Sequence, residues 1–144
     1  MKGGGVGGRR LPGRARFFRA ATSCPYPRRG DARREKRANV RAVAHDAEYA
    51  LDPDALEEAI RKDVSEGRQP CAVVATTGTT TSTALDPVAA IAAVARQYGL
   101  WLHVDAAMAG SAMILPECRW MWQGIEEADS LVLNAHKWLG AAFD

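Results

Sequence analysis

The sequence predicts an α/β fold built on a mostly parallel β-sheet that is flanked by helices. Three short, nearly continuous apolar runs, residues 71–76, 100–104 and 130–133, are typical of strands covered on both faces. Two segments between residues 52 and 99 carry apolar residues at helical spacing, and each begins at an Asp-Pro pair. Strands that alternate with helices in this way form β-α-β units, in which consecutive strands run parallel.

The first 39 residues differ in composition from the rest. Residues 1–40 carry twelve Lys or Arg against two acidic side chains, and residues 41–144 carry seven basic against fifteen acidic ones, so the formal net charge of +2 combines +10 with −8. Because glycine and arginine dominate residues 1–39 and no helical or strand periodicity is present, the composition predicts a disordered basic leader. A nucleic-acid-binding arm or an organelle-targeting peptide is the alternative, and it ranks second because no binding module accompanies the charge run.

The folded domain is expected to span residues 40–144 and to start with a strand at residues 40–44. Asp52 followed by Pro53 predicts the start of a helix, because the carboxylate can accept backbone N–H groups and proline already has a helical φ. Gly67 is expected to end this helix. Its buried stripe at i, i+4 and i+8 should consist of Leu56, Ile60 and Val64.

The next elements repeat this pattern. Residues 71–76 predict a strand, and Asp86-Pro87 predicts a second helix start by the same device, with Gly99 as its stop. Strands at residues 100–104 and 130–133 follow. We therefore expect residues 71–105 to form one right-handed β-α-β unit. The stripe buried by its helix should consist of Val88, Ile91, Val94 and Ala95.

Composition excludes several classes of protein. Cys24, Cys71 and Cys118 are too few and too scattered for a secreted disulfide framework, and no Cys/His cluster has zinc-ligand spacing, so we expect a reducing, cytoplasmic setting and no metal. The longest uncharged apolar stretch, around residues 106–116, is shorter than the ~20 residues that a membrane-spanning helix needs. Neither membrane insertion nor secretion is expected.

Polar groups follow each of the last three predicted strands. They are Thr76–Thr81 with Gly78, then His103-Val104-Asp105, and then Asn134-Ala135-His136-Lys137. Each group alone has an ordinary structural explanation, such as a hydroxyl-rich turn or a capping carboxylate. The carboxyl ends of parallel strands meet at one sheet edge, however, and ligands of open α/β sheets bind there. The joint placement therefore favours a ligand site.

A lysine, an aspartate and several hydroxyl or amide groups at one sheet edge are what a pyridoxal phosphate site requires. The amine of lysine can form a Schiff base with the cofactor aldehyde, and a buried carboxylate keeps the pyridine nitrogen protonated. The protonated ring accepts the electron pair that remains when an amino acid loses CO₂. The sequence therefore predicts pyridoxal 5'-phosphate as the cofactor.

Four motifs carry a family resemblance: Ala75-Thr76-Thr77-Gly78-Thr79-Thr80, Leu102-His103-Val104-Asp105-Ala106-Ala107, Ala128-Asp129-Ser130 and Asn134-Ala135-His136-Lys137-Trp138. In order and spacing they closely resemble the group II pyridoxal phosphate-dependent amino-acid decarboxylases, with the aromatic-L-amino-acid decarboxylases nearest. The resemblance runs from about Val40 to Asp144. It implies the large domain of the fold-type I (aspartate aminotransferase-like) enzymes.

The resemblance also implies residue roles. Lys137 is the catalytic residue that forms the Schiff base, and Asp105 pairs with the pyridinium nitrogen. Ala107 packs against one face of the cofactor ring. The hydroxyl of Thr80 touches the cofactor, while Asn134 and His136 lie near its phosphate.

Other aromatic and histidine residues have weaker assignments. His103 either orients the Asp105 carboxylate or is a packed structural residue. His45 lies outside every motif and is expected to be structural or exposed. The four tryptophans are expected to pack in the core rather than to form a substrate cage. They are Trp101, Trp120, Trp122 and Trp138.

The implied activity is decarboxylation of an L-amino acid, of the aromatic class by resemblance alone. Members of the family are several hundred residues long and dimeric, so the resemblance implies a homodimer and suggests that these 144 residues are a fragment with the central part of the cofactor domain. Two alternatives remain open. One is another fold-type I enzyme, such as an aminotransferase, because that fold supports several reactions. The other is an inactive fragment with a basic nucleic-acid-binding arm.

Overall fold

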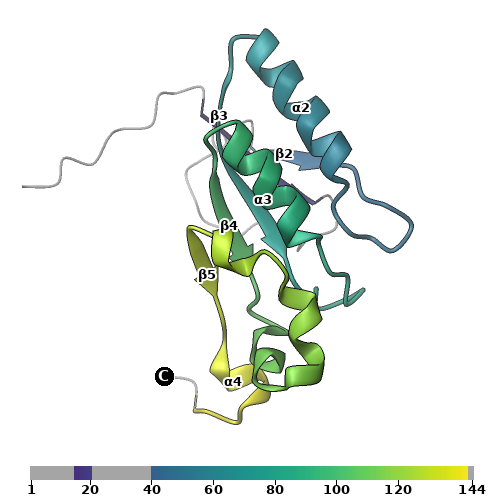
Figure 1. Cartoon of the computed structure of the whole chain (residues 1–144), viewed down its shortest axis with the longest axis vertical. Helices are drawn as coiled ribbons and strands as arrows, with labels where there is room; N and C mark the ends of the chain where they lie inside the picture. The colour runs from purple at the N-terminus through teal and green to yellow at the C-terminus, as the bar shows by residue number, and fades with distance from the viewer. Residues whose placement is uncertain (1–14, 21–39, 143–144) are drawn as a thin grey trace, which may run out of the picture.

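The computed structural model describes residues 15–20 and 40–142 (Figure 1). Its strands form one sheet in the order β2-β1-β3-β4-β5, and every neighbouring pair is parallel. The predicted α/β fold class is therefore confirmed. The strand bounds are β1 Ala15–Ala20, β2 Val40–Val43, β3 Gln69–Thr76, β4 Trp101–Asp105 and β5 Ser130–Val132.

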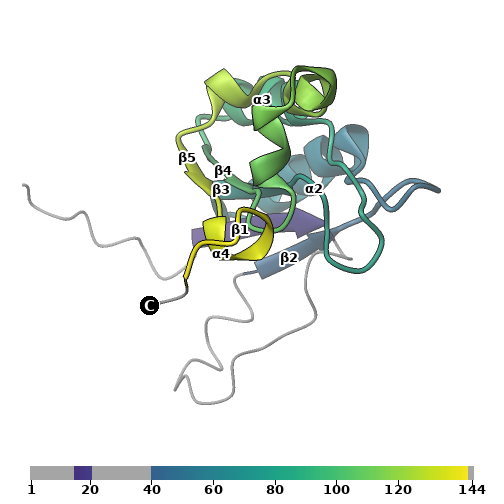
Figure 2. The ribbon, with the colours of Figure 1, turned by 90° about the horizontal axis from the view of Figure 1, so that it is seen from below.

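Helices α2 (Pro53–Ser65) and α3 (Val88–Gln97) pack on one face of the sheet (Figure 2). The hydrophobic core lies between them and the strands. A one-turn helix, α4 (Ala135–Trp138), follows β5, and the segment between β4 and β5 contains 3₁₀ turns at Gly110–Ile114, Pro116–Trp122 and Ile125–Glu127. Fully buried core side chains include Leu56, Ile60, Val73, Ile91, Leu102 and Val104.

Strand alternation explains which residues enter this core. In β4, Leu102 and Val104 are buried against the helices, whereas Trp101, His103 and Asp105 point to the opposite face and keep some exposure. Burial of a leucine or valine side chain contributes about 1.5–3 kcal/mol, so this alternation determines the face on which the helices pack. Helices α2 and α3 thus pack against the face that carries Leu102 and Val104 and not against the face that carries Asp105.

The first strand corrects a prediction. The composition of residues 1–39 predicts no strand, but residues 15–20 form β1 between β2 and β3, with Phe17 in register with both Val40 and Ala72. A strand that pairs on both sides is specified by its backbone hydrogen bonds, and it does not need an alternating sequence. The remainder of the predicted leader lies outside the described residues, so the boundary at residue 40 stays a prediction.

Helix α2 starts as predicted. The side chain of Asp52 accepts hydrogen bonds from the backbone N–H groups of Asp54, at 2.9 Å, and Ala55, at 3.2 Å. These two donors belong to the first turn, where no intrahelical acceptor exists. Gly67, at φ +71°, follows the end of the helix.

Replacing Asp52 with alanine is expected to lower the free energy of unfolding by about 1 kcal/mol, because the cap bonds are lost. Urea unfolding followed by far-UV circular dichroism measures this change. Asp54→Ala is the matched control, since Asp54 is exposed in the first turn and donates only its backbone N–H to the cap. An Asp54→Ala variant that loses as much stability as Asp52→Ala would contradict the capping role.

The buried stripe of α2 differs from the prediction at its last position. Val64 is 54% exposed, and Asp63 is fully buried in its place. Asp63 accepts hydrogen bonds from Arg41 Nε of β2, at 3.1 Å, and from Arg68 Nη1, at 2.9 Å. Position 63 faces the sheet because it lies three residues after Ile60 on the helix. A buried carboxylate needs such cationic partners, so the two arginines determine which residue turns inward.

Candidate functional site

The carboxyl ends of β3, β4 and β5 lie level with one another. Thr76 is in register with Asp105, and Asp105 with Val132. Beyond the ladder, Thr77 N–H donates to the Asp105 carbonyl and Ala106 N–H to the Val132 carbonyl, both at 3.0 Å. Helix α4 lies just past this edge, at the lower end of Figure 1. The three predicted polar groups therefore start from the same edge of the sheet.

Asp105 ends β4 with part of its carboxylate available. The side chain is half-buried, and Oδ1 accepts the backbone N–H of Ala107 at 3.1 Å. Within the described ranges, Oδ2 has no hydrogen-bond partner. The turn at Ala107 thus orients the carboxylate and leaves one oxygen for a ligand. Ala107 itself is half-buried and has only a methyl group, so it takes up little space beside this carboxylate.

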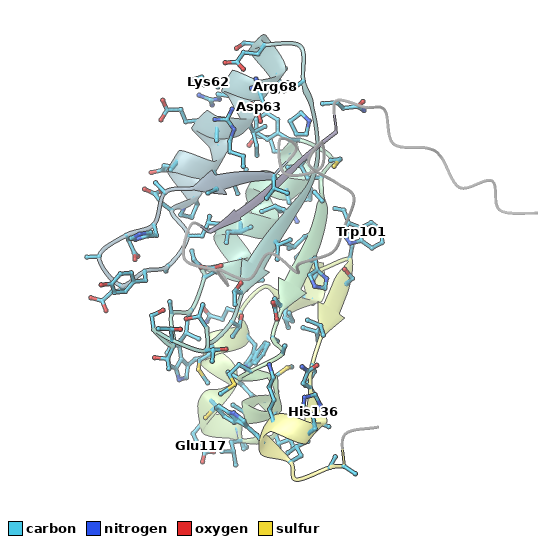
Figure 3. The ribbon with its side chains drawn as sticks, turned by 180° about the vertical axis from the view of Figure 1, so that it is seen from behind. Lys62, Asp63, Arg68, Trp101, Glu117 and His136 are labelled. Carbon is cyan, nitrogen blue, oxygen red and sulfur yellow. The ribbon has the colours of Figure 1, made fainter. Side chains whose placement is uncertain are left out.

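Lys137 lies in the single turn of α4. Asn134 precedes this turn in an extended conformation, and its carbonyl accepts the Lys137 N–H at 3.1 Å. Lys137 is exposed and forms no ion pair with the part of the chain that the structure describes. Asn134 makes no side-chain capping bond, and His136 is half-buried at the end of the molecule shown in Figure 3. The amine of Lys137 is therefore accessible to a ligand.

The threonine-rich loop after β3 packs against the segment that follows β4. Gly78 has φ +74°, and a Cβ atom at this position would lie 2.3 Å from Cβ of Ala109. The side chain of Thr79 is hydrogen-bonded within the loop. Its Oγ1 lies 2.7 Å from the Ser82 hydroxyl and accepts the Ala84 N–H at 3.1 Å. Thr80 is exposed, and no side-chain hydrogen bond to it is seen among the described residues.

The available groups fit the predicted cofactor. At this edge, Thr80, Asp105, Asn134 and Lys137 have polar side-chain atoms without partners in the described part, and the Oγ1 atoms of Thr76 and Thr77 are buried without partners there. An accessible amine, a free carboxylate oxygen and several hydroxyl and amide groups are the donor set that pyridoxal phosphate needs. Among the described residues, no group of three or more His, Cys, Asp or Glu could hold a metal ion.

Asp86 has a different role from the one that the sequence predicts. It is 3% exposed, and its Oδ1 and Oδ2 accept the N–H groups of Leu51 and Thr76, both at 2.7 Å. The prediction that Asp86 caps the next helix is wrong, because Pro87 occupies the cap position of α3 and makes no side-chain cap bond. The carboxylate instead turns inward, where backbone N–H groups of a loop and of β3 need an acceptor.

The surroundings of Asp86 also shift the pKa of its carboxyl. Burial raises its pKa above the ordinary value of 3.8, although the N–H groups of Leu51 and Thr76 oppose this shift, and the charge of Asp46 adds to it. When the pKa of an acid is higher in the folded state than in the unfolded state, the acid stabilises the folded state most strongly at pH values below its unfolded-state pKa. That contribution is lost as the pH rises through the folded-state pKa.

We therefore expect the stability advantage of the unmodified chain over Asp86→Asn to narrow as the pH rises from about 4 toward 7. Asn does not titrate, and its amide can accept only one of the two N–H groups, so the variant is less stable at every pH. Urea unfolding at several pH values measures the gap. Asp54→Asn, at an exposed position of α2, is the control, and a gap for Asp86→Asn that widens with pH would contradict the prediction.

The histidine and tryptophan predictions have mixed outcomes. His103 Nδ1 lies 2.8 Å from the Ser130 hydroxyl, so its observed partner is a serine rather than Asp105. His45 is exposed, as expected. Trp122 is 3% exposed and packs in the core, but the core prediction is wrong for three tryptophans, which lie outside the layer between the helices and the sheet. Their exposures are 53%, 64% and 52% for Trp101, Trp120 and Trp138.

The fold and the site define a class of protein: the pyridoxal phosphate-dependent enzymes of fold type I. Within that class the match is specific. The family described as "Pyridoxal-dependent decarboxylase conserved domain" matches residues 32–144, and the chain belongs to this family. The predicted family resemblance is thus confirmed, and the match begins eight residues before the predicted start of the domain.

Individual relatives agree with this assignment. Tyrosine decarboxylase of Papaver somniferum is 48% identical over 108 residues, which are 74% of this chain and 21% of that protein. Phenylacetaldehyde synthase of Arabidopsis thaliana is also 48% identical over 108 residues, covering 74% of this chain and 22% of that protein. The crystal structure of Oryza sativa TDC with PLP superimposes with a TM-score of 0.79 at 38% identity, over 91% of this chain and 28% of that one. The chain therefore spans about a fifth of the length of the curated relatives.

Proposed function

We propose that the protein decarboxylates an L-amino acid of the aromatic class, with pyridoxal phosphate bound covalently at Lys137. The observation that carries this proposal is the placement of Asp105 and Lys137. They follow adjacent parallel strands at one sheet edge, and each has a polar group without a partner in the described part of the chain. The names of the relatives, among them tyrosine decarboxylase, support the aromatic class.

Each proposed site residue has a distinct task. Lys137 would hold the cofactor through its amine. Asp105, with its free Oδ2, would keep the ring nitrogen of the cofactor protonated, and the small side chain of Ala107 would leave room for the ring. Bound pyridoxal phosphate supplies an electron sink for the electron pair left when CO₂ departs. The contacts to the cofactor and its phosphate are assigned to Thr80, Asn134 and His136.

The position of Lys137 suits this role. It is the second-last residue of a four-residue helix, and the amine is not held by an ion pair among the described residues. A lysine amine forms a Schiff base only in its neutral form. The short helix is itself joined to β5 through Asn134, so Lys137 takes its position from the sheet.

A second candidate function is supported by one relative. Phenylacetaldehyde synthase of Arabidopsis thaliana is as similar to this chain as tyrosine decarboxylase of Papaver somniferum, at 48% identity each. The segment from Asp105 to Lys137 therefore suits enzymes that are named for different products. Product analysis separates the candidates: a decarboxylase releases CO₂ and an amine, an aldehyde synthase forms an aldehyde, and an aminotransferase releases no CO₂.

We also propose that the protein is a cytoplasmic homodimer that binds an amino acid. Scattered cysteines support a reducing compartment, and the family resemblance supports a dimer. Several apolar side chains remain exposed after β4, including Ile114, Leu115 and Trp120, as expected of a surface that contacts another part of an assembly. No helix in the described part is long and apolar enough to cross a bilayer. Sedimentation equilibrium of the protein tests the dimer.

Reductive trapping tests the cofactor proposal. The chain is incubated with pyridoxal phosphate, treated with borohydride and digested for peptide mapping. We expect one labelled peptide that contains Lys137, because borohydride fixes the cofactor on the lysine that binds it. A chain labelled only at Lys62, an exposed lysine of α2, would count against the proposed site. Release of CO₂ from aromatic L-amino acids then tests the reaction.

A further inference from the structure

Strand β5 is a short edge strand that leads directly to the proposed catalytic lysine. It has only three residues, which pair with β4 as His103↔Ser130, Val104↔Leu131 and Asp105↔Val132. In the described sheet β5 has no strand on its other side. A ladder of three residue pairs holds a strand weakly, so side-chain contacts between β4 and β5 decide how firmly this strand is placed.

Ser130 makes the contacts of this kind. Its hydroxyl accepts a hydrogen bond from Trp101 Nε1 at 2.9 Å and lies 2.8 Å from His103 Nδ1. Strand alternation and register put Trp101, His103 and Ser130 on the same face as Asp105. We refer to Trp101, His103 and Ser130 as the Ser130 clasp. Figure 3 shows Trp101 at the start of β4, with His136 at the far end of the β5 segment.

Hydrogen-bond chemistry assigns the direction of one of the two contacts in the Ser130 clasp. An indole N–H can only donate, so the Ser130 oxygen accepts from Trp101. The hydroxyl proton is then available for His103 Nδ1, and with this direction of the bond we expect the tautomer with its proton on Nε2. His45 has the opposite arrangement, because its Nδ1 lies 2.8 Å from the carbonyl oxygen of Asp46 and must donate to it. His45 therefore serves as an internal reference for the Nδ1–H tautomer.

The neighbouring residue strengthens the attachment. Asp129 N–H donates to the Leu102 carbonyl at 2.9 Å, and Asp129 Oδ2 accepts the Leu102 N–H at 2.7 Å. At the other end of β5, Ala106 N–H donates to the Val132 carbonyl at 3.0 Å. Strand β5 is therefore attached at its start by side chains and a backbone bond, and at its end by a backbone bond next to Asp105.

We propose that Ser130 is a positioning residue that holds β5 in register on β4 and thereby sets the location of Lys137 relative to Asp105. The role of Lys137 in this inference rests on the proposed function. Lys137 follows Ser130 by seven residues, and Asp105 follows His103 by two. Because one hydroxyl bonds two side chains of β4, a slip of β5 along β4 breaks both bonds. Ser130 acts through the strand and does not touch the reacting atoms.

The test compares Ser130→Ala with Ser130→Thr, which keeps the hydroxyl and suits a strand. The first readout needs no cofactor. Nitrogen-15 NMR at alkaline pH, where imidazoles are neutral, reports the tautomers of His45 and His103. In the unmodified chain and in Ser130→Thr we expect the Nε2–H tautomer at His103 and the Nδ1–H tautomer at His45. Ser130→Ala should change the tautomer balance of His103 alone.

Amide hydrogen exchange is the second readout. In Ser130→Ala, exchange of the Ala106 amide should be about tenfold faster, as expected when one or two side-chain hydrogen bonds that support the strand are lost. The Thr77 amide, which bonds the Asp105 carbonyl across the β3–β4 pair, should keep its rate. Ser65→Ala is the matched control, because Ser65 bonds only the Lys62 carbonyl on the surface of α2.

Labelling of Lys137 is the third readout and links the inference to the cofactor. Ser130→Ala should slow reductive labelling by about tenfold, in line with the change in exchange, and Ser130→Thr should restore it. An unchanged His103 tautomer balance together with unchanged Ala106 exchange in Ser130→Ala overturns the inference. Absence of labelling in the unmodified chain overturns the proposed function instead. If Ser130→Ala does not fold, Trp101→Phe should keep the His103 tautomer and still accelerate Ala106 exchange.

Discussion

Lys137→Ala is expected to abolish reductive labelling with pyridoxal phosphate and to lower CO₂ release by ~10³-fold or more, the scale on which loss of a covalent catalytic residue acts. Alanine has no amine to bind the aldehyde. The fold should persist, because Lys137 is exposed and makes no ion pair with the described residues. Peptide mapping after borohydride treatment and a CO₂-release assay measure the two effects.

Lys62→Ala is the matched control for this substitution. Lys62 is an exposed lysine in the last turn of α2, far from the carboxyl edge of the sheet (Figure 3). Labelling and CO₂ release should be unchanged in this variant. A Lys137→Ala protein that still incorporates the cofactor at a single lysine would refute the assignment of Lys137. Circular dichroism of both variants checks that neither effect arises from unfolding.

Gly78→Ala should be strongly destabilising. Gly78 has φ +74°, a conformation that costs a non-glycine residue about 1–2 kcal/mol. The added Cβ would also lie 2.3 Å from Cβ of Ala109, and overpacking of this kind costs a further ~1–3 kcal/mol. We therefore expect a total loss of roughly 2–5 kcal/mol in the free energy of unfolding. Urea unfolding measures it.

Gly99→Ala separates these two contributions. Gly99 has φ +64°, but nothing lies within 4 Å of a Cβ atom added there. This variant should lose only the conformational part, about 1–2 kcal/mol. If both alanine variants lose the same stability, the contact between the threonine loop and the segment after β4 does not constrain position 78. Because that loop carries Thr80, Gly78→Ala should also weaken cofactor binding, whereas Gly99→Ala should not.

The two Asp-Pro pairs show when a local sequence pattern predicts a helix cap correctly and when it does not. The same dipeptide predicts a capping carboxylate at both Asp52 and Asp86. At Asp52 the prediction is confirmed, because the acceptor groups and the N–H donors are neighbours in the chain. Asp86 instead bonds Leu51, which is 35 residues away, and Thr76. A local pattern cannot show that a distant backbone N–H competes for the same carboxylate.

Helix α2 and strand β1 reveal the same limit in packing. Helical spacing predicts the stripe through Leu56 and Ile60, but spacing alone does not distinguish Val64 from Asp63 as the next inward position. The arginines that make burial of Asp63 possible come from β2 and from the residue just before β3. Likewise, β1 is identified as a strand by its pairing with β2 and β3, because its own sequence has no strand periodicity.

The sequence by itself determined the class of fold, the strands that carry the site and the residues that lie at their ends. It could do so because the turn signals, strand lengths and motifs that define Asp105 and Lys137 are local. Only the tertiary structure decided that Ser130 bonds Trp101 and His103, and that Asp105 keeps a free carboxylate oxygen. These contacts depend on which strands are neighbours and on their register, and a chain specifies both only when it is folded.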